Sequence, residues 1–103
     1  MEEKLFVGVG RVGFYFRQAR SLKDKRSILQ RIKQRLRNEG WSVVELSFSD
    51  DFKRGFLGFC YASSSATHLD NAFQKASELF IGNFEILQKE KDSLEFSIYF
   101  PIQ

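Results

Sequence analysis

The chain has 103 residues, 43% of them hydrophobic and 28% charged, and carries a formal net charge of +3. This length predicts one domain over 1–103, and this hydrophobic content can fill a packed core, which excludes an intrinsically disordered protein. The single cysteine, Cys60, excludes an intramolecular disulfide and a metal centre built on thiolates. There is no apolar run of about 18 residues that would span a membrane. The acidic start, Met1-Glu2-Glu3, is unlike a signal peptide, so we expect a cytoplasmic protein.

The apolar pattern predicts two helices and five strands. In chain order these are a strand over 5–16, a helix over 22–38, strands over 41–48 and 56–62, a helix with its apolar seam over 69–80, and strands over 84–89 and 94–100. The first six elements have the order of the ferredoxin-like split βαβ fold, an α+β antiparallel sheet with two helices on one face. Residues 94–103 then add an extra C-terminal strand to this single domain.

Residues with known roles at helix ends flank both predicted helices. Ser21 precedes the first helix with Asp24 three residues later, which is the spacing of a capping box. Gly40 follows this helix and suits the left-handed position after a helix end. The serines at 63–65 supply a cap for the second helix, and Gly82 ends it. The glycines at 8, 10 and 13 indicate that the first strand bends or that another element lies close to it.

The positive charge is concentrated in one segment. Residues 11–37 contain ten basic residues and one acid, whereas the rest of the chain holds six basic and twelve acidic residues. Neighbouring cations on a helix repel one another by a few tenths of a kcal/mol per pair. Such a face indicates an anionic partner such as a phosphate backbone. The alternative is a solvated face whose charges serve solubility alone.

The candidate anion-binding or RNA-binding residues come from the first helix and the segment before it. Lys25 is the odd member, because it falls near the apolar seam, where a lysine stem at the seam edge or a pairing with an acid would also explain it. The full set is Arg17, Arg20, Lys23, Lys25, Arg26, Lys33 and Arg37.

The hexapeptide Ser-Leu-Lys-Asp-Lys-Arg at 21–26 follows a strand that begins Phe-Val-Gly-Val at 6–9. In this context the chain resembles the YlxP-like family of small bacterial proteins of unknown function, whose signature is Ser-Leu-Lys-Glu-Lys-Arg. A weaker similarity covers Asp-Asp-Phe-Lys-Arg at 50–54, where Phe52 and Lys53 stand in place of the family's Trp and Gln. The resemblance spans about 4–90. It implies a ferredoxin-like fold, a bacterial cytoplasmic protein and an association with translation and ribosome-maturation genes, but no established activity.

Two sequence matches to nucleotide-binding motifs fail on their context. Residues 8–13 match the dinucleotide fingerprint G-x-G-x-x-G, but the strand continues through them and the helix opens only at Ser21. Residues 54–61 resemble the third-strand signature of the RNA-recognition motif with one residue too many. That residue, Leu57, sends Phe56 to the face opposite Phe59, which removes the paired stacking platform.

Several other residues have a structural interpretation. His68 is the only histidine, so neither a metal site nor a catalytic pair with a second imidazole can form, and we expect it in an exposed first helical turn. Asp50 and Asp51 fit a polar turn, and Cys60 fits an inert buried thiol. Large apolar groups on both faces of the sheet predict that something covers its second face, most simply a homodimer or the C-terminal strand.

These observations predict a non-enzymatic, dimeric domain without a metal or cofactor. Its basic helix would bind an anionic partner, such as RNA or the ribosome. The alternative is a homodimeric protein-interaction or small-ligand regulatory module that acts through its sheet face.

Overall fold

The computed structural model describes residues 4–46, 51–83 and 94–99, of which 81–83 and 94–99 are described by their backbone. The fold is of the α+β class, with one antiparallel β-sheet and two helices. The elements in chain order are β1 (Phe6–Tyr15), α1 (Leu22–Asn38), β2 (Ser42–Glu45), β3 (Arg54–Ser63), α2 (Ala66–Asn83) and β4 (Leu94–Tyr99).

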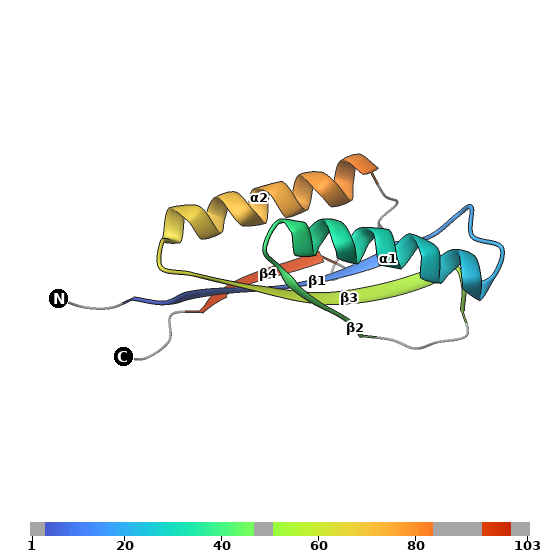
Figure 1. Ribbon diagram of the computed structural model, residues 1–103, viewed down its shortest axis with the longest axis horizontal. Helices are drawn as coiled ribbons and strands as arrows, with labels where there is room; N and C mark the ends of the chain where they lie inside the picture. The colour runs from blue at the N-terminus through green and yellow to red at the C-terminus, as the bar shows by residue number, and fades with distance from the viewer. Residues whose placement is uncertain (1–3, 47–50, 84–93, 100–103) are drawn as a thin grey trace.

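The strands pair in the order β2-β3-β1-β4, and every pair is antiparallel. Both helices lie on the same face of this sheet (Figure 1). The α+β class, the antiparallel pairing and the two helices on one face were all predicted from the sequence and are confirmed. The predicted strand over 84–89 lies outside the described residues. The predicted C-terminal strand is β4, which extends the sheet beside β1 and does not cover its second face.

The ends of α1 are built as the capping residues predicted. Ser21 is the N-cap, and its Oγ accepts a hydrogen bond from the Asp24 N–H at 3.1 Å. The Asp24 carboxylate reaches back to the Arg20 N–H at 2.9 Å, one residue before the position that a standard capping box uses. At the other end Gly40 has φ +100°, and the Trp41 N–H donates to the Leu36 carbonyl at 3.0 Å. This pattern is a Schellman motif, which turns the chain from α1 into β2.

The second helix is capped in the same way. The Ser65 Oγ accepts a hydrogen bond from the His68 N–H at 3.1 Å, as the run of serines before the helix predicted. Leu69, Phe73, Ala76 and Phe80 of this helix are all buried. The predicted apolar seam is therefore the face that packs on the sheet.

The core lies between the helix layer and the sheet, and aromatic rings dominate it. Phe14 of β1 meets Phe80 of α2 edge-on with the ring centroids 5.6 Å apart. Trp41 meets Phe59 of β3 at 4.9 Å and Phe73 of α2 at 5.4 Å. These contacts join α2, β3 and the end of α1 into one core, and contacts of this geometry contribute about 0.5–1.5 kcal/mol per pair beyond area burial.

Glycines on the helix-facing side of the sheet make room for these rings. A Cβ at Gly8 would overlap the Phe73 ring, and a Cβ at Gly10 would overlap the Phe59 ring. The glycines of the first strand predicted that another element lies close to it. The structure shows that the close neighbours are aromatic side chains, which pack directly on the glycine backbone.

We predict that Gly10→Ala destabilises the protein by about 1–3 kcal/mol, because the buried Phe59 ring must move to admit the methyl group. The midpoint of urea unfolding measures this loss. Gly58→Ala is the matched control on β3, since the nearest atoms to its Cβ all belong to the exposed Leu46 side chain, the closest being Cδ2 at 3.0 Å. Equal losses for the two variants would contradict this account of Gly10.

Candidate functional site

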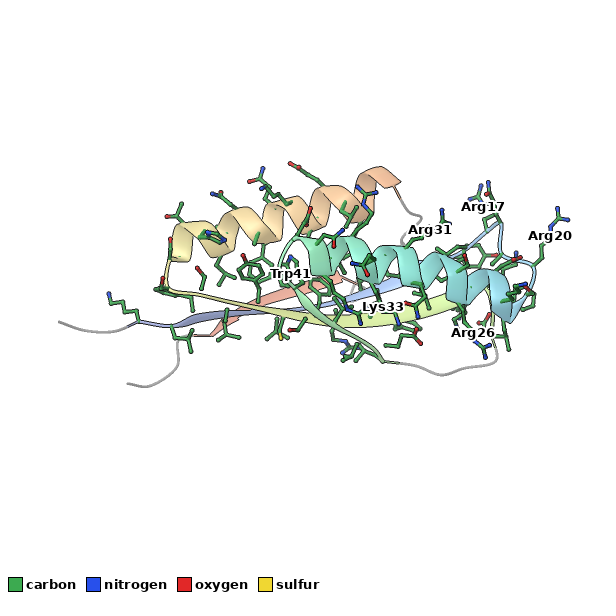
Figure 2. The ribbon with its side chains drawn as sticks, viewed as in Figure 1. Arg17, Arg20, Arg26, Arg31, Lys33 and Trp41 are labelled. Carbon is green, nitrogen blue, oxygen red and sulfur yellow. The ribbon has the colours of Figure 1, made fainter. Side chains whose placement is uncertain are left out.

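Five of the seven predicted anion-binding side chains are exposed. Arg17 and Arg20 lie in the segment between β1 and α1, while Lys23, Arg26 and Arg37 lie on α1. Figure 2 shows Arg17, Arg20 and Arg26 at the end of the molecule where α1 begins. The segment and the helix thus bring these cations together at one end and along one side of the fold.

Lys25 has a different environment. It is 5% exposed, and its Nζ donates a hydrogen bond to the Asp51 backbone carbonyl at 2.8 Å. A buried ammonium group requires such partners, because desolvating it without them costs several kcal/mol. Lys25 therefore ties the first turn of α1 to the segment that leads into β3, and its charge is turned away from solvent.

Lys33 also lies at the edge of the helix–sheet interface. Its Nζ is 3.0 Å from the Glu45 Oε1 of β2, and the two side chains are 12% and 22% exposed. The acid offsets the charge of Lys33 locally. This pair fixes the flank of α1 that faces β2, and it removes Lys33 from the cations that a partner would meet.

A second lysine tether, which the sequence did not predict, shapes the segment before α1. The Lys53 Nζ donates to the Arg17 carbonyl at 2.7 Å, and the Phe16 N–H donates to the Lys53 carbonyl at 2.7 Å. The Lys53 N–H donates in turn to the Asp51 Oδ1 at 2.8 Å. The only sequence signal was the Asp51-x-Lys53 spacing, which is typical of an Asx-turn.

No acid among the described residues offsets the remaining cations of α1 or Arg20 just before it. Across residues 4–46 and 51–83, no ion pair involves the six side chains Arg20, Lys23, Arg26, Arg31, Arg35 and Arg37. Asp24 is the one acid within α1, and its carboxylate accepts the Arg20 N–H. We call Arg17, Arg20, Lys23, Arg26, Arg31, Arg35 and Arg37 the basic surface. All seven residues are exposed.

The start of α1 is not itself a free anion site. The Ser21 Oγ already accepts from the Asp24 N–H, and the Asp24 carboxylate, which accepts from the Arg20 N–H, places a negative charge at this end of the helix that repels an anion. Any anion at the basic surface would therefore be held by side chains.

On β1 and β3, the second sheet face has no paired aromatic rings on which bases could stack. Phe59 is buried against Trp41, and Tyr61 also meets Trp41 at 5.1 Å, so both rings lie on the helix side of β3. Phe56 falls on the opposite face, as the extra residue in this segment predicted. The RNA-recognition-motif arrangement, with paired aromatic rings on the open face, is thus absent from β1 and β3.

A shallow hollow of about 530 Å³ lies on this open face above Gly58. Gly58 pairs with Arg11 of β1 on one side and with Val44 of β2 on the other, so a gap lies between their side chains. The rim is mostly apolar, with Val44 59% and Leu46 46% exposed. Cys60 also lines the hollow and is exposed, so the expected burial of this thiol is wrong.

His68 is exposed at the start of α2, as predicted, and its Nε2 lies 2.8 Å from the Tyr61 hydroxyl. In the described part of the chain, no group of three or more His, Cys, Asp or Glu side chains is placed to hold a metal ion. Among the described helices, none has the length and apolar character that crossing a membrane requires.

We predict that Lys25→Met lowers the free energy of unfolding by about 1–3 kcal/mol, because the Asp51 carbonyl loses a charged hydrogen-bond donor. Chemical denaturation measures the change. Lys23→Met is the matched control: it removes an exposed charge from the same turn, and we expect a change within about 0.5 kcal/mol. If Lys25→Met were as stable as Lys23→Met, the tether would have no energetic role.

No curated protein matches the chain. Among solved structures, a de novo designed protein, Foldit4, is similar over 98% of this chain and 99% of its own, with a TM-score of 0.45 and 9% sequence identity. A likeness at that level carries no argument about fold or function. Residues 7–90 match the model of a family described as "Protein of unknown function (DUF503)". This match covers most of the chain, which therefore belongs to the DUF503 family.

Proposed function

We propose that this protein is a non-enzymatic binding protein whose basic surface holds the phosphate backbone of structured RNA. The observation that carries the proposal is the set of exposed cations on α1 without acidic partners in the described residues. Like charges three and four residues apart on one helix are destabilising in the absence of an anion. A phosphate backbone supplies regularly spaced negative charges that relieve this repulsion.

The composition of the proposed site follows from burial and pairing. Lys25 and Lys33 belong to the scaffold, because each ammonium group is held by an oxygen of a neighbouring segment. Arg17, Arg20, Lys23, Arg26 and Arg37 are the contacts to the anion. Lys53 contributes by holding the backbone between β1 and α1, which places Arg17 and Arg20.

We assign the sheet order to the ferredoxin-like arrangement, with β1 and β3 in the centre. The hexapeptide at 21–26 resembles the YlxP-like signature, and the association of such genes with ribosome maturation supports a ribosomal RNA or its precursor as the partner. A cytoplasmic location accords with that partner.

We predict that the protein binds mixed RNA with a log–log salt slope of about −3 to −4, for roughly four neutralised phosphates. Filter binding over a range of salt concentrations measures this slope. A flat salt response would contradict binding through phosphates.

Charge reversal at Arg26 tests the location of the site. We expect Arg26→Glu to lower the affinity for RNA at least about tenfold, since a charged hydrogen bond is replaced by repulsion. Lys75→Glu is the matched control, because it makes the same change in net charge at an exposed position of α2. Equal losses for the two variants would show that total charge, and not the basic surface, governs binding.

A second candidate function, a homodimer formed through the sheet face, is favoured by the exposed apolar rim of the hollow. Val44 and Leu46 are 59% and 46% exposed, and Leu5, which precedes β1, is 49% exposed. Packing two such faces together would remove these side chains from water.

We predict that light scattering shows a dimer at high protein concentration and that Val44→Lys shifts it to the monomer. Cys60 reports the same event, because its thiol lines the hollow and would be shielded from alkylating reagents in the dimer. Thr67→Lys, on the exposed start of α2, is the control and should leave the dimer intact. A concentration-independent monomer with a freely reactive Cys60 would contradict this candidate.

A further inference from the structure

The outer side of α1 carries a regular row of uncharged polar side chains that the proposed function does not use. Four exposed, uncharged polar residues recur at spacings of three and four and form a ridge along the helix: Ser27, Gln30, Gln34 and Asn38. The Gln34 Nε2 donates to the Asn38 Oδ1 at 2.9 Å, which places these two side chains together on that ridge.

Arginines flank this ridge on both sides. At about 100° per residue, Arg26 and Arg37 lie about 75° to one side of it, and Arg31 and Arg35 lie about 75° to the other. Figure 2 shows Arg26 on the side of α1 nearer β2, where Lys33 also lies, and Arg31 on the opposite side. Lys33 pairs with Glu45 of β2 at 3.0 Å, and this contact independently fixes which side of α1 carries the first row.

Two rows of cations with hydrogen-bonding groups between them match a duplex groove. The phosphates of the two strands border the groove, and hydrogen-bonding groups form its floor. A single strand offers one row of phosphates, which would leave one of the two arginine rows without a partner. The pattern therefore favours a double helix.

The position of α1 in the fold decides which groove fits. Its inner face, with Leu29, Ile32 and Leu36, is buried on the sheet, and α2 lies in the same layer (Figure 1). Trp41, just after α1, packs against Phe73 of α2. A helix of about 10–12 Å diameter must project by most of its width to reach the floor of the DNA major groove, which is about 8.5 Å deep. A helix that packs side by side with another helix in one layer exposes only its outer face, and such a face fits a wide, shallow groove.

We infer that α1 lies along the shallow minor groove of A-form double-stranded RNA. In this arrangement Gln30 and Gln34 hydrogen-bond to the 2′-hydroxyl groups of the groove, while the two arginine rows contact the phosphates on either side. The inference rests on the proposed function and specifies its ligand as duplex RNA recognised by shape.

The test compares three ligands with the full-length protein at one salt concentration: an RNA duplex, a DNA duplex of the same sequence and one strand of the RNA. We expect the RNA duplex to bind about tenfold or more tightly than the DNA duplex, since two or more hydrogen bonds to 2′-hydroxyls contribute to that difference. Equal affinity for the two duplexes, or a preference for the DNA duplex or the single strand, would overturn the inference and leave phosphate binding in place. No binding to any of the three would overturn the proposed function itself.

Variants of the ridge separate hydroxyl contacts from charge. We expect the double variant Gln30→Ala and Gln34→Ala to weaken binding of the RNA duplex about tenfold without changing the salt slope, because it removes hydrogen bonds and no charge. Alanine favours a helix at exposed positions, so the loss would not reflect unfolding. Gln74→Ala, on the exposed side of α2, is the control. Wild-type affinity in the double variant would overturn the contact between the ridge and the groove.

Discussion

Two lysine ammonium groups that donate to backbone carbonyls set the geometry of the end of the molecule where the positive charge gathers. Lys25 of α1 donates to the Asp51 carbonyl. Lys53, just before β3, donates to the Arg17 carbonyl, between β1 and α1. Lys25 thus holds the segment that contains Lys53, and Lys53 holds the segment just before the helix that contains Lys25. The Lys25 ammonium group is withdrawn from water and needs such an acceptor, whereas the Lys53 contact lies at an exposed position. The segment between β1 and α1 is thereby held against the start of β3.

The contacts in the fold divide the basic residues around α1 into two groups. Lys25, Lys33 and Lys53 serve the fold, because their charges are satisfied by oxygens within it. The arginines, together with Lys23, remain on the surface. The division has a chemical reason: a lysine is a compact point charge on a flexible stem and can thread to one carbonyl, whereas a guanidinium presents several donors that suit phosphates. The proposed contacts with RNA are accordingly made mainly by arginine.

The two faces of the sheet are packed differently. On the helix side, bare glycine backbone admits the rings of Phe59 and Phe73, so the core is closed and aromatic. On the other side, Gly58 leaves a hollow between Arg11 and Val44 that no described element covers. The cations of α1 and this open face lie on opposite sides of the sheet, so the proposed RNA binding and the proposed self-association would use different surfaces.

The sequence by itself determined the α+β class, the two helices, both ends of α1 and the start of α2, whereas α2 continues past the predicted stop at Gly82 to Asn83. Apolar spacing and capping residues are local signals, and Ser21, Asp24 and Gly40 act within a few residues of themselves. It also determined that Phe56 and Phe59 face opposite ways, because side chains alternate along a strand. Tertiary structure alone decided which cations are held by oxygens of the fold. The partners of Lys25, Lys33 and Lys53 lie 26, 12 and 36 residues away, and such distances in sequence carry no periodic signal. The exposure of Cys60 was likewise decided by tertiary structure, because it depends on which elements pack over each face of β3.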